Sequence, residues 1–262
     1  MHITITGNLG SGKSTVCKIL QDKYGYEIYS TGKVQRKLAK ELNMTTLEFN
    51  KQMCNDHRYD NMIDEATARI SRENKDKKII FDSRLAWNFV EKSFKIFLSV
   101  PIDIAAQRVM NDKKRGEVES YSSLEEAKAQ LSQRATTEKA RYKDIYNLDY
   151  FDFNNYNLII DSSYNDPEKI AEIIINEAYN YNESPYDNTK YLLSPQRLIN
   201  KDDISKNDVI RLENIIYQYK GKKIVSHGIK IIEQNNDFTI LEGEDNIKAA
   251  NIANVDYIKI EG

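Results

Sequence analysis

Several features that narrow a protein's function are scarce in this chain of 262 residues. It has only two cysteines, Cys17 and Cys54, which form neither a disulfide framework nor a metal-ligand pattern. Its 38 Lys and Arg against 40 Asp and Glu leave a net charge of −2, without the basic surplus of a dedicated nucleic-acid binder. No apolar run approaches the ~20 residues of a membrane span, and no leader precedes the first expected strand. We therefore expect a cytoplasmic protein without a nucleic-acid or membrane partner.

A glycine-rich stretch near the N-terminus is the most informative feature that is present. Residues 7–14 match the phosphate-loop pattern G-x-x-x-x-G-K-[ST], between a β-branched run at 3–6 and a helical pattern. Such a loop aims backbone N–H groups at phosphate oxygens at a helix N-terminus, and its glycines permit the close approach. Lys13 then reaches the terminal phosphates, and the Ser14 hydroxyl binds Mg²⁺. The residues expected to bind ATP are Gly7, Asn8, Leu9, Gly10, Ser11, Gly12, Lys13, Ser14 and Thr15.

The larger N-terminal part alternates short apolar runs with helical periodicity. This alternation predicts an α/β protein with a parallel sheet covered by helices on both faces. The expected strands are 2–6, 26–30, 78–82, 95–100 and 157–161. The expected helices are 13–24, 32–42, 45–54, 58–73, 101–112, 122–146 and 166–181.

A polar stretch at 181–190 is aperiodic and contains a proline, which indicates a domain boundary. We expect domains at 1–181 and 190–262. In the second, an α+β pattern places strands at 191–193, 228–233, 237–241 and 257–260, and helices at 205–219 and 245–253. The middle two strands read as a hairpin around 234–236. About 70 residues is near the lower limit for an independent core, so this part should pack against the first.

Polar residues follow the second and third strands, at the sheet edge where ligands bind in open α/β folds. Thr31 can cap the next helix, Gly32 permits a close ligand, and Arg36 can pair with a phosphate or lie solvated at the surface. Arg84 follows the third strand, at the edge where an arginine is expected to point at substrate. Asp82, before it, either supports Mg²⁺ or caps a helix at 84–92, and the sequence leaves both readings open.

Cations are frequent between Arg108 and Arg141. Within the long helix there, Arg134, Glu138 and Arg141 follow i, i+4, i+7 spacing and share one face. Two arginines beside a carboxylate can hold a transferring phosphoryl group. The alternative is an exposed ladder of ion pairs on a solvated helix.

These blocks, in this order, resemble the cytidylate kinases in their compact form. The stretches that carry the resemblance are 7–14, 30–32 with Arg36, 83–86 and 134–149, within residues 1–180. The resemblance implies a phosphate-loop nucleoside-monophosphate kinase with a five-stranded parallel sheet and an arginine-rich lid. It implies phosphoryl transfer from ATP, with Mg²⁺, to CMP or dCMP.

The same resemblance implies roles for individual residues. Acceptor binding falls to Thr31, Gly32, Arg36, Asp60, Asp64, Arg84, Arg134, Glu138 and Arg141. Asp60 and Asp64 would position the base. Catalysis falls to Lys13, Arg108, Arg115, Arg134 and Arg141, with Arg108 and Arg115 closing on the transferred phosphoryl group. Ser14 and Asp82 would serve the metal ion.

The C-terminal part resembles, more loosely, the ParB/sulfiredoxin-like module. Residues 193–199 match its opening and 238–250 its glycine motif. Asp245 and Asn246 stand where that family has basic residues or histidine, which disfavours a triphosphate there. This interpretation favours a structural tail, or one that binds a protein partner or a second copy.

The leading hypothesis is therefore an ATP-dependent (d)CMP kinase whose small-molecule partners are nucleotides. Two alternatives remain from the sequence. One is a phosphate-loop kinase for another small acceptor. The other is a non-catalytic nucleotide sensor whose tail is regulatory.

Overall fold

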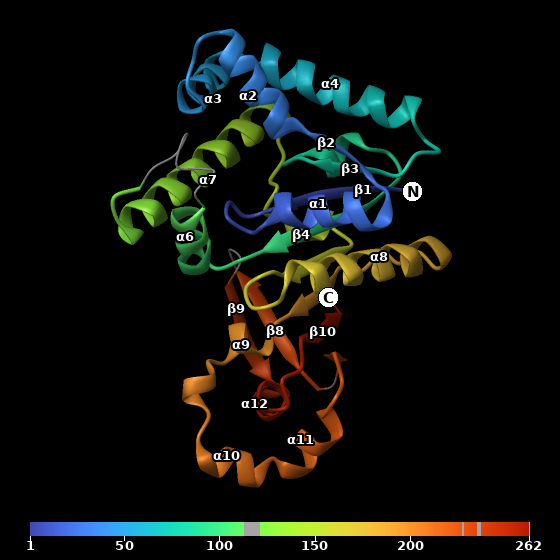
Figure 1. Ribbon diagram of the computed structural model, residues 1–262, viewed down its shortest axis with the longest axis vertical. Coiled ribbons are helices and arrows are strands. Elements are labelled where there is room, and N and C mark those ends of the chain that lie inside the picture. Colours follow the sequence, from blue (N-terminus) through green and yellow to red (C-terminus); the bar gives the residue numbers. More distant parts are fainter. Residues whose placement is uncertain (113–120, 227, 235–236, 262) are drawn as a thin grey trace.

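The computed structural model describes residues 1–112, 121–226, 228–234 and 237–261. The larger N-terminal part, blue to yellow in Figure 1, occupies the upper portion of the view. The C-terminal residues, orange to red, lie below helix α8 (Pro167–Glu183). Within the described residues, no helix is both long and apolar enough to cross a membrane.

One sheet runs through both parts of the chain. Its strands are, in spatial order, β2 (Glu27–Ser30), β3 (Ile79–Asp82), β1 (His2–Gly7), β4 (Ser93–Ser99), β5 (Leu158–Asp161), β6 (Lys190–Leu193), β10 (Tyr257–Glu261) and β7 (Ile224–Val225). The first six pair in parallel, β10 is antiparallel to β6, and β7 is parallel to β10. The α/β class with a mostly parallel sheet is confirmed.

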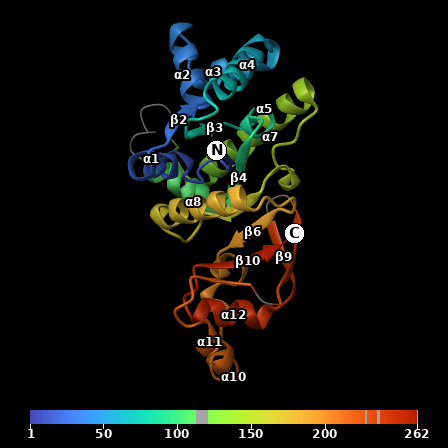
Figure 2. The same cartoon turned by 90° about the vertical axis from the view of Figure 1, so that its right-hand side faces the viewer.

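The predicted number of five strands is wrong, since the sheet of the described residues has eight. The five expected strands are all present. The sheet continues because β6 pairs with the outer side of β5, matching Ile159 with Tyr191 and Ile160 with Leu192. The polar stretch at 181–190 separates β6 from the first five strands in the sequence, and a sequence pattern does not reveal which strand edges pair. Figure 2 shows β6 and β10 close beneath α8.

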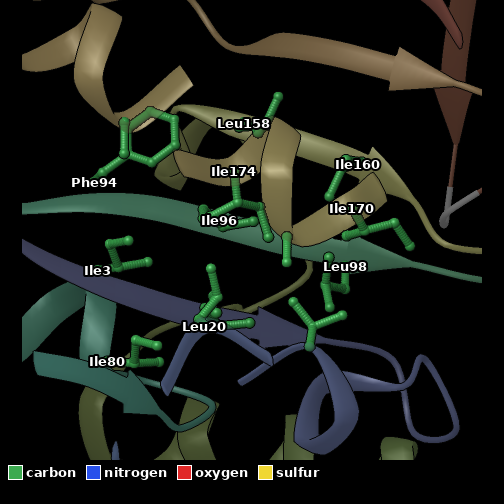
Figure 3. Close-up of a cluster of buried hydrophobic side chains, with 14 of the residues drawn as sticks. Ile3, Leu20, Ile80, Phe94, Ile96, Leu98, Leu158, Ile160, Ile170 and Ile174 are labelled. Carbon is green, nitrogen blue, oxygen red and sulfur yellow. The ribbon is translucent and has the colours of Figure 1, made fainter. Parts of the chain in front are cut away.

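The central core lies between the sheet and two helices, α1 (Lys13–Tyr24) and α8. Strand residues at alternate positions face it, as period-2 geometry requires. Figure 3 shows this layer, with the labelled residues Ile3, Leu20, Ile80, Phe94, Ile96, Leu98, Leu158, Ile160, Ile170 and Ile174. The C-terminal part adds two buried side chains to the same cluster, Leu192 and Tyr257.

The opposite face is covered largely by aromatic residues. Phe97 and Ile159 alternate with the inward residues of their strands and pack here. They meet the short helix α5 (Ala86–Phe89), the C-terminal end of α7 (Leu124–Tyr146) and the aromatic segment after α7. Helix α6 (Ile102–Asn111) packs against α7.

Three further helices stand beyond the β2 edge, at the top of Figure 1. They are α2 (Thr31–Glu41), α3 (Thr46–Asn55) and α4 (Arg58–Glu73). Phe49 and Met53 of α3 are fully buried against α2 and α4. Thr45 and Glu48 form a capping box at the start of α3, which satisfies two backbone N–H groups there.

The C-terminal part forms a second core around β10 and α12 (Glu244–Ile252). The predicted hairpin is confirmed as β8 (Lys230–Gln234) and β9 (Asp237–Glu242), although residues 235–236 at its turn lie outside the described part. The predicted single helix at 205–219 is wrong. Leu212 leaves the helical conformation and buries its side chain, which separates α10 (Lys206–Arg211) from α11 (Glu213–Tyr219). The short α9 (Pro195–Leu198) follows β6.

Candidate active site

The phosphate loop connects β1 to α1 as its motif requires. Gly10 has a φ of 78°, and a Cβ there would lie 2.8 Å from the carbonyl oxygen of Ala105, so only glycine fits. The Asn8 side chain accepts a hydrogen bond from Val100 N at 3.0 Å, which fixes the loop against the end of β4. The loop forms one wall of a cleft of about 860 Å³.

Lys13 lies in this loop with its ammonium group directed back onto the backbone. Its Nζ donates to the carbonyl oxygens of Gly7 at 3.1 Å and Asn8 at 3.2 Å. Burial, together with the positive charge of Arg84, lowers the pKa of Lys13 to about 7. An anionic phosphate entering the cleft would stabilise the charged form of this group.

The ends of β2 and β3 form the next part of the cleft. Asp82 accepts a hydrogen bond from Ser30 Oγ at 3.0 Å, and both side chains line the cleft together with Thr31, Gly32 and Arg36. The alternative reading of Asp82 as a helix cap is wrong, because α5 begins at Ala86 with Leu85 as its N-cap. Thr31 also does not cap α2: it is the first helical residue, and Ser30 precedes it as the N-cap.

Glu138 joins two arginines across the cleft. Its Oε2 accepts from Arg84 Nε at 2.8 Å and its Oε1 from Arg134 Nε at 2.9 Å. Burial opposes the charge of Glu138, but the two guanidinium groups outweigh it and lower the pKa of this carboxyl to about 2. Arg84 also donates to the Gly7 carbonyl oxygen, so this network connects α7 to the phosphate loop. The solvated-ladder alternative for this helix face is wrong, since Glu138 is 6% exposed.

Arg141 lies one turn further along α7 and is separate from that network. It is buried, and its Nε is 3.5 Å from the Asp60 carboxylate of α4. Asp64, also on α4, accepts a hydrogen bond from the Tyr146 hydroxyl at 2.8 Å. Burial raises the pKa of Asp64 to about 7. Asp64 lines a second, shallower groove between α4 and α7, away from the phosphate loop.

Arg108 of α6 reaches the cleft from the side opposite α2. Its Nη2 donates to the backbone carbonyl oxygens of Ser162 at 2.6 Å and Ser163 at 3.0 Å. These two serines follow β5 directly and also line the cleft. Arg115, predicted beside Arg108, lies outside the described residues.

The cleft contains two oxygen-bearing side chains of the kind that Mg²⁺ binds. The Ser14 hydroxyl and the Asp82 carboxylate both line it. Mg²⁺ in nucleotide sites is held by one or two protein oxygens together with substrate phosphates, rather than by a full protein cage. Within the described residues, no three or more His, Cys, Asp or Glu side chains are grouped so that they could hold a metal ion.

Sequence reasoning missed part of the cleft. The further lining residues include Gln35, Asp112, Tyr142, Ser162, Ser163, Tyr164 and Asn165. Four of these follow β5, and the rule that ligands bind at the carboxyl ends of parallel strands points to them. Tyr142 lies within the stretch 134–149 that carries the resemblance, which was the available signal, whereas nothing local distinguishes Gln35 from a surface residue.

The fold and the cleft define a phosphate-loop nucleotide-binding protein. The cleft wall opposite the phosphate loop is rich in arginine. A model described as "Cytidylate kinase-like family" matches residues 2–164. The chain is 36% identical over 174 residues to a cytidylate kinase of Methanocella arvoryzae, covering 66% of this chain and 94% of that protein. It is 32% identical over 199 residues to a cytidylate kinase of Haloarcula marismortui, and the match covers 73% of this chain and 99% of that protein. The chain belongs to the cytidylate kinase-like family.

Among solved structures, an uncharacterized protein from Eubacterium ventriosum shares the fold. The TM-score is 0.53 at 16% identity, and the match covers 69% of this chain and 98% of that chain. The family match ends at residue 164. Helix α8 and the C-terminal strands of the sheet therefore lie beyond it.

Proposed function

We propose that this chain transfers the γ-phosphoryl group of ATP to CMP or dCMP, giving ADP and CDP or dCDP. The observation that carries the proposal is one cleft lined both by the phosphate loop with Lys13 and by Arg36, Arg84 and Arg134. One half suits a triphosphate and the other a monophosphate. Family membership supports CMP as the acceptor.

The chemistry follows from positioning and charge. The backbone N–H groups of residues 7–15 hold the donor phosphates, and the Lys13 ammonium leaves the loop carbonyls for the β- and γ-phosphates. Mg²⁺, next to Ser14 and Asp82, would neutralise donor phosphate charge when bound. The acceptor oxygen is already anionic, so no general base is needed. Arg108 neutralises charge on the transferred group from the donor side, and Arg115 is proposed to do the same.

The acceptor half is proposed to work through three arginines in distinct surroundings. Arg36 is exposed at the rim, where its planar guanidinium can pair with the monophosphate. Arg84 and Arg134 are already oriented by Glu138, so less conformational entropy is lost when they bind phosphate.

Asp60 and Asp64 are proposed to position the base, and Arg141 is proposed to support monophosphate binding from the same helix as Arg134 and Glu138. The Asp60–Arg141 and Asp64–Tyr146 contacts hold α4 against the helix that carries Glu138. Thr31 and Gly32 complete the acceptor wall, where Gly32 leaves space beside the Arg36 guanidinium.

The test is an ADP-release assay with each of the common nucleoside monophosphates as acceptor. We expect CMP and dCMP to give the highest kcat/KM. A higher value for another acceptor would favour the alternative small-acceptor kinase. Tight ATP binding without turnover of any acceptor would favour the nucleotide sensor.

For residues 190–262 we propose a ParB/sulfiredoxin-like module without a triphosphate site, and a cytoplasmic location for the whole chain. Gly243 precedes α12 with a φ of 90°, and a Cβ there would collide with the Gly228 carbonyl oxygen, which supports a glycine-dependent motif. The first turn of α12 carries Glu244 and Asp245, so this helix start is acidic, although Asp245 pairs with Arg211. Calorimetry with the full-length Lys13→Ala chain tests the proposal, because micromolar binding of CTP at a second site would contradict it.

A further inference from the structure

We propose that Arg197, a residue of the C-terminal part, is a positioning residue for the donor-nucleotide side of the cleft. It lies on α9, beyond the residues matched by the family model. The inference rests on the ATP-dependent transfer proposed above. It assigns to the C-terminal part an influence on the affinity for ATP that acts through Asp161 and Ser99.

Arg197 is buried among groups of the N-terminal part. Its Nη1 donates to Asp161 Oδ1 at 3.0 Å and to Ser99 Oγ at 2.6 Å. The side chains of Arg197 and Asp161 are 5% and 0% exposed. On its other side the guanidinium lies 4.7 Å from the ring centroid of Phe238 in β9. A pair so well desolvated is costly to break, because the remaining charge has no water to solvate it.

Asp161 connects Arg197 to the cleft through the segment that follows β5. Its Oδ1 also accepts hydrogen bonds from the Ser163 backbone N–H, at 3.1 Å, and from the Ser163 hydroxyl. Ser162 and Ser163 line the cleft and hold Arg108 through their carbonyl oxygens. The position of Arg108 therefore depends on the carboxylate that Arg197 neutralises.

Ser99 provides a second connection, at the end of β4. Its carbonyl oxygen accepts from Ser162 N at 2.9 Å. The next residue, Val100, donates its N–H to the Asn8 side chain of the phosphate loop at 3.0 Å. Arg197 thus contacts the end of β4, which neighbours β1 and its phosphate loop, and the end of β5, the next strand outward.

Other groups of the C-terminal part contact the same segment. Tyr257 donates its hydroxyl to the Asp161 carbonyl oxygen at 2.9 Å. The Asn165 side chain, which lines the cleft, donates to the Asp256 carbonyl oxygen at 2.9 Å. The acceptor wall is formed by α2, the end of β3 and α7. In the sheet order, β2 and β3 lie on the other side of β1 from β4 and β5, whose ends Arg197 contacts. We therefore expect Arg197 to affect the donor more than the acceptor.

Steady-state kinetics of the full-length Arg197→Met and Arg197→Lys variants test this assignment. Methionine keeps much of the apolar volume and removes the charge. We expect KM for ATP to rise about fivefold or more in Arg197→Met while KM for CMP changes less than about twofold. Lysine restores the charge without the planar fork, so it should recover part of the loss. The Asp161→Asn/Arg197→Met double variant should lose less than the sum of the single changes.

Arg211→Ala is the matched control, because it breaks an exposed ion pair with Asp245 within the same part of the chain. Its kinetics should equal those of the parent chain. Direct ATP titration by calorimetry separates the proposed reaction from the proposed role of Arg197. A parent chain that binds ATP but transfers no phosphoryl group contradicts the reaction. Even in that case, Arg197→Met must weaken ATP binding if Arg197 is a positioning residue. Equal changes in both KM values, or none in either Arg197 variant, would overturn the positioning role. If Arg197→Met fails to fold, Arg197→Lys decides by the same criterion.

Discussion

The charged side chains of the cleft are held in place by neighbouring groups of the protein. Lys13 and Arg84 share one acceptor, the Gly7 carbonyl oxygen, and Glu138 orients Arg84 from the other side. Two like charges at one carbonyl repel each other, which contributes to the low pKa of Lys13. An anion between them removes this repulsion. The arrangement is therefore suited to bind phosphate, with Lys13 turning from the loop carbonyl oxygens toward the anion.

Lys13→Ala should abolish turnover while leaving the fold intact. Loss of a charge directed at the β- and γ-phosphates should cost about 3 kcal/mol or more of transition-state stabilisation, roughly a hundredfold or more in kcat. Lys18→Ala is the control, since Lys18 lies on the same helix and makes an exposed ion pair with Asp22. A Lys13→Ala chain with a near-normal kcat in the ADP-release assay would remove Lys13 from the catalytic residues.

Arg36→Ala should raise KM for CMP far more than KM for ATP. The side chain lies on the acceptor side and can bind the monophosphate through two parallel hydrogen bonds. Arg36→Lys should rescue poorly, because an ammonium group cannot form that fork. Lys37→Ala, next to it on α2 and paired with Glu41, serves as the control. Equal changes in KM for CMP and for ATP would show that Arg36 is a solvated surface residue and does not bind the acceptor.

Asp64 should make the unfolding free energy depend on pH. Its folded-state pKa of about 7 exceeds the ordinary value because the group is buried, so its stabilising contribution is present at low pH and lost as pH rises toward 7. Asp60, Arg141 and Tyr146 are the titratable or charged groups beside it. In urea denaturation, the stability gained by Asp64→Asn over the parent should therefore grow as the pH rises from about 4 to about 7 and stay constant above pH 7. Glu65→Gln, exposed on the same helix, should show no such gain.

At the scale of elements, α7 organises the acceptor half of the cleft. Its face carries Arg134, Glu138 and Arg141, but only the first two line the cleft. Arg141 and Tyr146 instead hold the helix against α4. One helix thus combines ligand contact in its middle with structural support near its end.

Glu138→Gln should lower both stability and affinity for CMP. The amide cannot neutralise Arg84 and Arg134, and breaking a buried ion pair from one side costs about 3 to 5 kcal/mol. Thermal unfolding and acceptor kinetics measure the two effects. Glu125→Gln, in the exposed first turn of α7, should leave both unchanged. An unchanged melting temperature in Glu138→Gln would show that this carboxylate does not hold the two arginines.

At the scale of the whole molecule, the C-terminal part completes the sheet that carries the cleft. β6 covers the edge of β5, and Tyr257 joins the central core. The domain boundary expected at 181–190 predicts that a chain ending near Tyr181 keeps its activity, with some stability lost because the two parts pack together. Because the two parts share one sheet, we expect such a shortened chain to lose much of its thermal stability.

A chain ending at Tyr181 should melt at least about 10 °C below the full chain, since it exposes the edge of β5 and removes Arg197 from the Asp161 carboxylate. A chain ending at Ile199 keeps β6 and Arg197 and should melt between the two. Calorimetric melting with the three chains makes the comparison. If the shortest chain melts within about 3 °C of the full one, the C-terminal part contributes little to stability.

Much of the fold and part of the site could be predicted from the sequence, because they depend on neighbouring residues. Residues 7–14 form a loop whose glycines, lysine and serine are consecutive, and the hydrophobic periods placed the five strands from β1 to β5 within a few residues. The roles assigned to Arg36 and Asp60 stay predictions. The pattern did not indicate the segment after β5 as a cleft wall, since its serines and asparagine resemble any polar loop.

The sequence by itself determined the phosphate loop, the alternation of strands and helices, and the resemblance to cytidylate kinases, since each is written in local order. Only the tertiary structure decided that Glu138 meets Arg84, 54 residues away, while Arg141 turns to Asp60. Only the tertiary structure joined β6 to β5 and Arg197 to Asp161. The physical reason is that strand edges and buried charges select partners by proximity and burial after the chain has folded. At strand edges and buried charges, residues distant in the sequence come into contact, and no local sequence pattern predicts which residues these are.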